Sequence, residues 1–405
     1  MREQAGQNFR SSGRQRSGGR RRVVMAAAAV AAGVVSLGTL APSAASAASG
    51  ASASASSAAT AARPDAVQKG LNSLVRDGGP PGALASVKDQ EGRTRSYTAG
   101  VGDLATGAKV PKDGQVRIGS NTKTFTAVVV LQLVAEKKVR LDASVDTYLP
   151  GLVRGDGIDG RRITVRQLLQ HTSGLPNYTD HLDFPAIQHR YFEPRELLDI
   201  ALKHKAHSAP GKKWEYNNTN YVLAGLIIQK VTGRPLAEEI DKRVVQRVGL
   251  RHTYFPTVGD QTIRERHPKG YVADPQGGPP RDFTTMDPSW GWAAGQMIST
   301  NADLNRFFGA LLSGRLLPKA QLDQMRTTIP AERLGPGVGY GLGLVSRPLS
   351  CGGVSWGHGG DIDGYETRGG VTKDGRAANV AVTKMPGSEA EMKRVEKVVD
   401  TALCR

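Results

Sequence analysis

The spacing of apolar side chains changes along the chain, and each change of spacing predicts a change of secondary structure. Residues 65–78 carry apolar side chains at helical spacing and end in glycine, which predicts a helix. Residues 82–103 alternate apolar and polar positions around a polar turn, which predicts a β-hairpin. Near the C-terminus, residues 389–403 predict an amphipathic helix whose apolar face holds Met392, Val395, Val398 and Val399.

The middle and the late parts of the sequence differ in the same way. Between about residues 120 and 250 the apolar positions repeat mostly at helical spacing. Residues 258–290 are rich in Gly, Pro and Asp and predict a loop. Residues 340–385 have the pattern of short strands separated by glycine-rich turns.

Strands are therefore expected early and late in the chain, with helices between them and at both ends. This order predicts an α+β fold: an antiparallel sheet built from both chain ends and flanked by helices, with an inserted, mostly helical subdomain. We place the sheet subdomain at residues 65–145 and 290–405 and the helical subdomain at residues 146–289. A cleft between the two is the natural place for a functional site.

Residues 1–47 have the pattern of an export signal. The basic segment "SGGRRRVV" precedes a long apolar stretch, and "ASA" at Ala45–Ala47 offers a cleavage site. The stretch is long enough for a membrane anchor as the alternative, but it consists mostly of Ala, Gly and Ser, which partition weakly into lipid. We therefore predict a cleaved signal peptide; the Sec and Tat export routes both stay open.

Residues 48–64 are rich in Ala and Ser and lack large apolar side chains, which predicts a disordered linker. No later run is long and apolar enough to span a bilayer, so we expect a secreted, extracellular product without a stable membrane anchor. The oxidising environment outside the cell favours a disulfide between Cys351 and Cys404, with two unrelated buried thiols as the alternative.

The net charge of the chain is +17. Residues 1–63 hold eight Arg and a single acidic residue, Glu3, and so contribute +7 of it. The rest carries no stripe of basic and aromatic residues, so we expect no nucleic-acid partner. The remaining positive charge fits solubility, or retention near an anionic cell wall.

The first candidate for chemistry is the pair Ser120 and Lys123 in "IGSNTKTFTAVVVLQLV". A helix that begins at Ser120 places the two side chains one turn apart on the same face. A lysine buried against this apolar helix has a lowered pKa, which makes a neutral amine base available to activate the serine. The alternative is a helix-capping serine with a surface lysine, because one S-x-x-K occurs often by chance.

Two further motifs follow in the chain. "WEYNNTN" contains Tyr216 and Asn218 as Y-x-N before an apolar helix, and "WGHGGDIDGY" contains His358 and Gly360 as H-x-G. The order S-x-x-K, Y-x-N, H-x-G resembles the penicillin-recognising serine hydrolases, most closely class C β-lactamases and secreted serine D-alanyl-D-alanine carboxypeptidases. Connecting phrases such as "LDASVDTYLPGL" and "ITVRQLLQHTSGLP" match as well, from about residue 70 to the C-terminus.

The resemblance implies a β-lactamase/transpeptidase-like fold and a role for each motif residue. Ser120 would be acylated, and Lys123 would sit beside it as proton acceptor or electrostatic partner. Tyr216 would approach from the helical subdomain and pass a proton between Ser120 and the leaving group. Asn218 would bond the substrate amide, and His358 and Gly360 would lie on the edge strand of the sheet. The backbone N–H groups of Ser120 and Asp361 would form the oxyanion hole.

Two features bear on the choice between the subfamilies. Cys351 and Cys404 also resemble a pair of the secreted carboxypeptidases, which favours these over the β-lactamases. The residue after H-x-G is Asp361, where the carboxypeptidase pattern has a hydroxyl residue suited to a substrate carboxylate. Asp361 would repel a carboxylate unless a cation neutralises it, and Arg368 is one candidate.

Other potential sites carry weaker signals. His171 in "QHTSGLP" is interpreted as a hydrogen-bonded structural residue, and Trp292 could belong to the core or line the cleft. The H-x-x-H formed by His204 and His207 has no acidic residue nearby, and residues 155–160 fit a surface loop better than a calcium site. We expect no metal and no cofactor.

The sequence thus favours a secreted D-alanyl-D-alanine carboxypeptidase that acts on peptidoglycan stem peptides or small D-amino-acid peptides through a Ser120 acyl-enzyme. β-Lactams would be acylating ligands. The alternatives are a class C-like β-lactamase, an esterase or a D-amino-acid amidase on the same site, and a non-catalytic penicillin-binding protein. The Ser120, Lys123 and Tyr216 set argues against the last, because binding alone needs no activated nucleophile.

Overall fold

The computed structural model describes residues 65–405 except 77 and 275. The predicted signal peptide (1–47) and linker (48–64) lie outside the described residues. Within the described part, no helix is long and apolar enough to cross a membrane.

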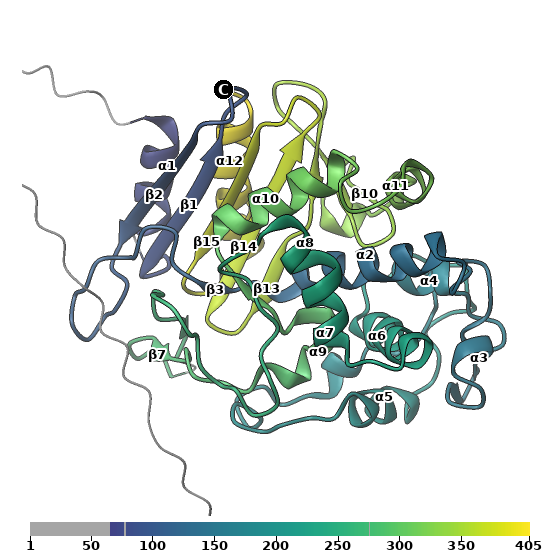
Figure 1. Cartoon of the computed structure of the whole chain (residues 1–405). Helices are drawn as coiled ribbons and strands as arrows, with labels where there is room; N and C mark the ends of the chain where they lie inside the picture. Colours follow the sequence, from purple (N-terminus) through teal and green to yellow (C-terminus); the bar gives the residue numbers. More distant parts are fainter. Residues whose placement is uncertain (1–64, 77, 275) are drawn as a thin grey trace, which may run out of the picture. The chain divides into compact units, whose positions relative to one another are not determined.

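A large antiparallel sheet joins strands from both ends of the described chain (Figure 1). The strand order is β2-β1-β15-β14-β12-β11-β10-β9, and β13 also pairs with β14. The first and last long strands of the described chain pair directly, β1 with β15, with Ala83 opposite Val382. The strands of this sheet are β1 (Gly82–Lys88), β2 (Thr94–Gly100), β9 (Ile329–Pro330), β10 (Gly339–Tyr340), β11 (Val345–Pro348), β12 (Val354–Gly357), β13 (Gly360–Ile362), β14 (Tyr365–Thr372) and β15 (Ala377–Val382).

The described residues form twelve α-helices, and ten of them, α2 to α11, lie between the early and late strands of the large sheet. The helices are α1 (Ala66–Leu74), α2 (Thr122–Ala135), α3 (Val145–Tyr148), α4 (Val165–Leu169), α5 (Pro194–Leu202), α6 (Asn218–Thr232), α7 (Leu236–Ile240), α8 (Gln246–Val248), α9 (Trp292–Gly295), α10 (Asn301–Leu312), α11 (Lys319–Arg326) and α12 (Glu389–Leu403). Three short two-stranded pairs complete the fold: β3 (Val116–Arg117) with β8 (Ile298–Ser299), β4 (Arg154–Gly155) with β5 (Ile158–Asp159), and β6 (Tyr271–Val272) with β7 (Arg281–Asp282). The α+β class and the sheet built from both ends are confirmed.

Helices α1 and α12 cover one face of the sheet. Successive side chains of a strand point to opposite faces, so Ala83, Ala85 and Val87 of β1 face this pair of helices. Val395 and Val398 of α12 pack into the same apolar cluster, as the sequence predicts for this helix. Met392, placed on the same face in the sequence, is only partly buried because it lies near the exposed start of α12.

Helix α10 packs on the opposite face, where asparagine side chains fix it to the strands. Asn301 donates to the carbonyl oxygen of Leu84 at 3.0 Å, and Asn305 donates to that of Ser86 at 2.8 Å. Asn379 of β15 in turn donates to Asn305 at 2.8 Å. These bonds pair polar groups that would otherwise be buried at a cost, and they set the position of α10 along the sheet.

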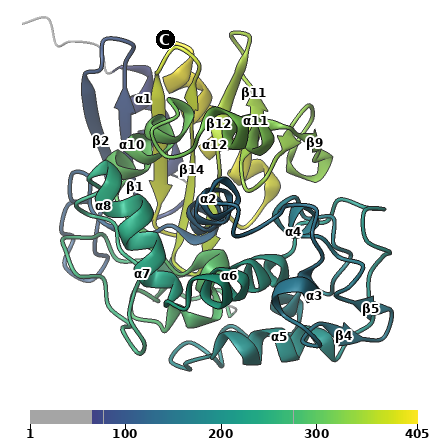
Figure 2. The same cartoon turned by 45° about the vertical axis from the view of Figure 1, so that its right-hand side comes forward.

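Helix α2 lies between the sheet and the other helices (Figure 2), with its side chains buried from Thr122 to Leu133. It packs against α6, α9 and α11, and Phe125 stacks on Phe307 of α10 with ring centroids 3.7 Å apart. A helix that is apolar all round must be enclosed on all sides, which explains why α2 is central. Because Lys123 belongs to this enclosed helix, its side chain lies in the interior of the protein.

The segment 258–290, predicted as a loop, is irregular apart from the two-residue strands β6 and β7 and the short 3-10 helix Pro288–Trp290. The buried side chain of Arg117 holds it: Nη2 donates to the carbonyl oxygens of Gln261 at 2.7 Å and Thr284 at 3.0 Å. A guanidinium can satisfy several carbonyl groups at once, so one arginine orders a long irregular segment.

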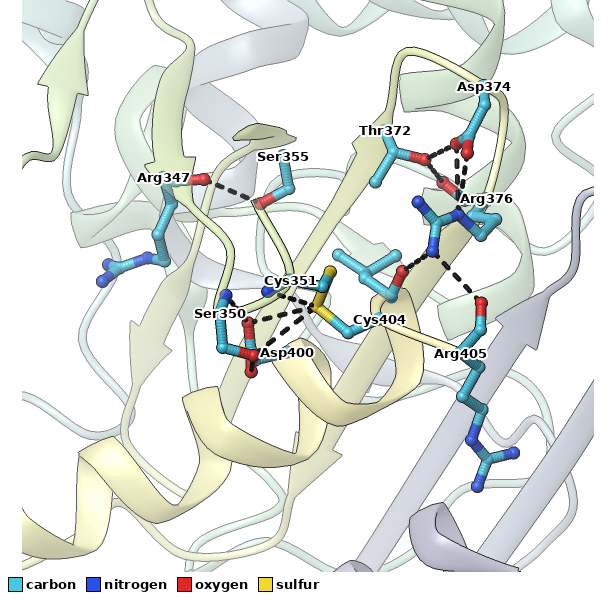
Figure 3. The surroundings of a disulfide bond; sticks show 11 residues. Arg347, Ser350, Cys351, Ser355, Thr372, Asp374, Arg376, Asp400, Cys404 and Arg405 are labelled. Carbon is cyan, nitrogen blue, oxygen red and sulfur yellow. Dashed lines mark hydrogen bonds and ion pairs between the residues drawn. A yellow bond between two sulfur atoms is a disulfide. The ribbon is translucent and has the colours of Figure 1, made fainter. Parts of the chain in front are cut away.

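The predicted disulfide joins Cys351 and Cys404, with the two Cα atoms 5.6 Å apart. It links the turn between β11 and β12 to the end of α12 (Figure 3). Asp400, one turn before Cys404, accepts hydrogen bonds from the backbone N–H and the hydroxyl of Ser350 at 2.8 and 2.5 Å. The turn is thus attached to α12 both covalently and by hydrogen bonds.

Candidate active site

Ser120 lies in a short 3-10 turn, Gly119–Asn121, that runs directly into α2. Gly119 has φ +46°, and a Cβ atom there would lie 2.9 Å from the backbone nitrogen of Asp361. A Cβ on Gly360 would lie 1.9 Å from the carbonyl oxygen of Ile118. Only glycines allow this approach of the serine turn to strand β13, which brings the first and third motifs together.

The Nζ atom of Lys123 lies within hydrogen-bond distance of three oxygen atoms. Ser120 Oγ is 2.9 Å away, Asn218 Oδ1 2.7 Å, and the carbonyl oxygen of Ala294 2.9 Å. The last two accept only, so they take two of the amine's hydrogens. A neutral amine then has its lone pair left for the hydroxyl hydrogen of Ser120, which is the arrangement of a general base.

The environment of Lys123 favours this neutral form. Burial holds the pKa of Lys123 well below its usual range, and the charge of Asp361 opposes this effect. The nearest partners of the amine are neutral, so nothing in contact with Nζ offsets the loss of solvation. The pKa shift and the hydrogen-bond geometry therefore assign the same role to this residue.

Tyr216 stands beside the serine and the lysine. Its ring centroid is 4.8 Å from Lys123 Nζ. Burial raises the pKa of the Tyr216 phenol well above its usual range, while the hydroxyl of Ser120 acts in the opposite direction. The phenol is thus protonated in the resting protein and can donate a proton during a reaction.

Asn218 is the first residue of α6, and its side-chain amide is engaged at both ends. Its Oδ1 accepts from Lys123, and its Nδ2 donates to Thr179 Oγ1 at 3.1 Å. The amide oxygen thus faces the lysine, and the amide nitrogen faces Thr179. A bond from Asn218 to a substrate amide stays a prediction.

A chain of hydrogen bonds joins the second and third motifs through the interior. The backbone N–H of Asn217 donates to His171 Nδ1 at 3.2 Å, so the proton of this imidazole sits on Nε2. His171 Nε2 lies 3.1 Å from the Tyr340 hydroxyl, which lies 3.0 Å from His358 Nε2. His358 Nδ1 then donates to the carbonyl oxygen of Gly359 at 2.6 Å.

Every member of this chain has one donor and one acceptor when all three rings are neutral. Burial lowers the pKa of His358 to about 3 and that of His171 well below its usual range, and it raises the pKa of Tyr340. The structural role predicted for His171 thus takes a specific form: it connects the Y-x-N segment to the H-x-G segment.

Asp361 lies on β13 with its side chain 47% exposed, and Arg368 on β14 contacts it, Nη1 to Oδ1, at 2.7 Å. Arg368, the candidate cation from the sequence, therefore does contact Asp361. The same guanidinium also lies 2.8 Å from Glu366 Oε1. One guanidinium thus contacts two carboxyl groups.

The remaining candidates lie away from this arrangement. Trp292 is 9% exposed and belongs to the main hydrophobic core, where a Cβ on Gly225 of α6 would contact its ring. This is the placement of a core residue, and a role in substrate binding stays a prediction. His204 stacks on His181, and His207 pairs with Glu215 at 2.9 Å. Among the described residues, no group of three or more His, Cys, Asp or Glu is placed to hold a metal ion.

Four groups that contact the candidate active-site residues could not be predicted from the sequence: the Ala294 carbonyl, Thr179, Tyr340 and Glu366. A backbone carbonyl can come from any residue type, so Ala294 left no side-chain signal. Tyr340 is part of "YGLGLVS", which was interpreted only as a strand segment. The spacing of Glu366 and Arg368, two apart on a strand, indicates a shared face but not its burial.

The arrangement can carry out acyl transfer. Lys123 can take the hydroxyl proton as Ser120 Oγ attacks a carbonyl carbon. Transfer of a proton from the Tyr216 phenol to the leaving group stays a prediction. The backbone N–H groups of Ser120 and Asp361 belong to segments in direct contact. Their use as the oxyanion hole stays a prediction.

Residues 67–402 match the Beta-lactamase family, and the chain belongs to this family. It is a serine hydrolase of the β-lactamase/transpeptidase-like fold.

Three similar proteins illustrate the range of activities in the family. A D-stereospecific amidohydrolase from Streptomyces sp. is 40% identical, with a TM-score of 0.76 over 83% of this chain and 98% of that one. The D-amino acid amidase of Ochrobactrum anthropi SV3 is 29% identical, with a TM-score of 0.75 over 83% of this chain and 96% of the other. Esterase EstB of Burkholderia gladioli is 29% identical over 73% of this chain and 84% of its own length.

The chain spans a smaller part of other relatives. Its match to Protein flp of Staphylococcus aureus, at 30% identity, covers 38% of this chain and 31% of that protein.

Proposed function

We propose that this protein hydrolyses amide bonds on the carbonyl side of D-amino-acid residues, with D-amino-acid amides and short D-peptides as substrates, through an acyl-enzyme on Ser120. The observation that carries the proposal is the position of Asp361. Its carboxylate is exposed on the strand that touches the serine turn, where recognition of a substrate carboxylate would require the opposite charge.

The charge near the site distinguishes the substrate classes. A carboxylate favours a neutral amide or ester leaving group, and it favours a substrate with a free ammonium group. The similarity to the Streptomyces D-stereospecific amidohydrolase and to the Ochrobactrum D-amino acid amidase supports the same assignment. EstB supports ester hydrolysis as an accompanying activity, since an ester is easier to cleave than an amide by the same acyl transfer.

A D-alanyl-D-alanine carboxypeptidase acting on peptidoglycan stem peptides is the second candidate, and one observation favours it. The 2.7 Å contact of Arg368 with Asp361 offsets part of the negative charge that would repel a C-terminal carboxylate. β-Lactams are expected to acylate Ser120 under either proposal. Export by the signal peptide predicted at residues 1–47 would place the activity outside the cell.

Steady-state kinetics with four substrates test the proposal: D-alaninamide, L-alaninamide, N-acetyl-D-alanyl-D-alanine and its C-terminal amide. We expect kcat/KM for D-alaninamide to exceed that for L-alaninamide by at least about tenfold, which corresponds to about 1.4 kcal/mol of transition-state binding. Equal rates for the two enantiomers would contradict D-selectivity. A tenfold preference for the free-acid dipeptide over its amide would instead identify a carboxypeptidase.

A further inference from the structure

A buried acidic side chain lies beside Asp361, at the paired position of the neighbouring strand. Glu366 on β14 is opposite Asp361 on β13 in the register of the sheet, and it is 0% exposed. Its Oε1 lies 2.8 Å from Arg368 Nη2, yet neither carboxyl oxygen has a partner in hydrogen-bond geometry. A carboxyl group this poorly compensated is costly to keep ionised in the interior.

Arg368 is the only cation in contact with both carboxyl groups among the residues the structure describes. Nη1 contacts Asp361 and also donates to the carbonyl oxygen of Thr367 at 2.9 Å, while Nη2 contacts Glu366. The guanidinium is buried and held on several sides. Its single positive charge is therefore divided between the two carboxyl groups whenever both are ionised.

We propose that Glu366 is a specificity-determining positioning residue: it contends with Asp361 for Arg368 and so sets how much negative charge Asp361 presents to the substrate. With Glu366 neutral, the Arg368 charge is balanced by Asp361 alone, and the site tolerates an anionic leaving group. With Glu366 ionised, the guanidinium is shared between Asp361 and Glu366. The site then presents a net negative charge that disfavours an anionic leaving group.

The other acidic groups near Glu366 also favour its neutral form at neutral pH. Glu396 of α12 lies 4.0 Å from Arg368 Nε, but it is paired with Arg347 of β11 at 2.9 Å. Burial raises the pKa of Glu366 to about 8, with Asp361 and Glu396 adding to the rise and Arg368 opposing it. The opposing strand β15 places the apolar Val382 at the paired position. Ionisation of Glu366 is thus expected at mildly alkaline pH.

The test uses two esters of one N-acetyl-D-amino acid, with glycolate and glycolamide as leaving groups. Both form the same acyl-enzyme, and neither substrate changes its charge between pH 6.5 and 9.5. Titration of Lys123 affects attack on both esters alike, so it cancels in the ratio of their kcat/KM values. This inference rests on acyl transfer by Ser120 but not on the preference for amides, so the two proposals fail separately.

We expect the glycolamide-to-glycolate ratio of the wild-type protein to rise at least threefold between pH 7 and pH 9. In the Glu366→Gln variant, which keeps the size of the side chain, the ratio should stay at the wild-type pH 7 value. In Asp361→Asn it should be lower than in the wild type at both pH values, because the carboxylate that repels the glycolate leaving group is absent. A rise in Glu366→Gln equal to that of the wild type would overturn the proposal, as would a flat wild-type profile.

A spectroscopic measurement on the wild-type protein gives an independent check. The infrared difference spectrum between pH 6.5 and pH 9 should lose one protonated-carboxyl band, and Glu366→Gln should lack that band. If the wild type shows no such band, Glu366 does not change its protonation between pH 6.5 and pH 9 and the proposal is wrong.

Discussion

The side-chain oxygen of Asn218 lies 2.7 Å from Lys123 Nζ and fixes the direction of one of the amine's hydrogens. A neutral amide at this position leaves the lysine free to lose its proton. Asn218→Asp would place a carboxylate there and favour the ammonium form.

We expect Asn218→Asp to move the pH midpoint of acylation upward by at least one unit, which slows acylation at neutral pH about tenfold. The measurement is the second-order rate of Ser120 acylation by a chromogenic β-lactam or ester, from pH 5.5 to 10. Asn177→Asp is the matched control, because Asn177 contacts the backbone of Asn218 but not Lys123. An unchanged profile in Asn218→Asp would refute the general-base role of Lys123.

Ser120→Ala and Lys123→Ala remove the two parts of one catalytic unit. Because nucleophile and base act together, each variant should lose at least about a thousandfold in kcat/KM. Ser120→Ala should keep its thermal transition, since it loses one small, partly exposed hydroxyl. Mass spectrometry after exposure to penicillin should find an adduct only in the wild type. Full activity in either variant would show that Ser120 and Lys123 are not the nucleophile and base.

Tyr340→Phe would interrupt the chain between His171 and His358 without changing the ring. The loss leaves a buried imidazole N–H and a buried ring nitrogen unpaired, which costs about 1–3 kcal/mol each. We expect lower stability and a reduced kcat, because the H-x-G segment loses its tie to the Y-x-N segment.

Tyr365→Phe is the control for that variant. It removes a buried hydroxyl that donates to the carbonyl oxygen of Pro268 at 2.8 Å and has no part in the hydrogen bonds between His171, Tyr340 and His358. Thermal unfolding and kcat measured together separate the two effects. If both variants lose the same activity for the same loss of stability, the positioning role of Tyr340 is not supported.

Stability should also depend on Glu366 and pH. The folded-state pKa of about 8 lies above the ordinary value of 4.5, so the stability contributed by this group is complete below pH 4.5. It is lost as the pH rises toward 8, by at most about 1.4 kcal/mol per pH unit. Glu366→Gln should therefore gain stability relative to the wild type between pH 5 and pH 8, with no further gain above. Chemical denaturation across this range would show a constant difference if the carboxyl group is ionised throughout.

The Cys351–Cys404 bridge closes a loop with a sequence separation of 53 residues. Replacing both cysteines by serine should lower the free energy of unfolding by about 4 kcal/mol on the chain-entropy estimate. Denaturant unfolding of the oxidised wild type and of the double variant measures this difference. Peptide mapping without reductant should recover the linked pair, and two free thiols would contradict it.

The sequence located the parts of the site that depend on side-chain type at fixed spacing: Ser120, Lys123, Tyr216 and Asn218. It also showed that both chain ends contribute strands, because alternation is a local property. It could not show that the carbonyl of Ala294 accepts from the lysine, since a backbone group carries no residue signal. Nor could it place Glu366 in the interior, because charged residues on alternating strands are usually exposed.

The pairing of β1 with β15 has a consequence for how the protein folds. Ala83 of β1 is paired with Val382 of β15, so two neighbouring strands of the sheet come from distant parts of the chain. Contacts of such high sequence separation require closure of a very long loop, and they slow folding. During synthesis, β1 has no partner on this side until the last few dozen residues have emerged. The apolar face of the β1–β2 hairpin stays uncovered for that time, so this hairpin is exposed to aggregation until β15 and α12 are available to cover it.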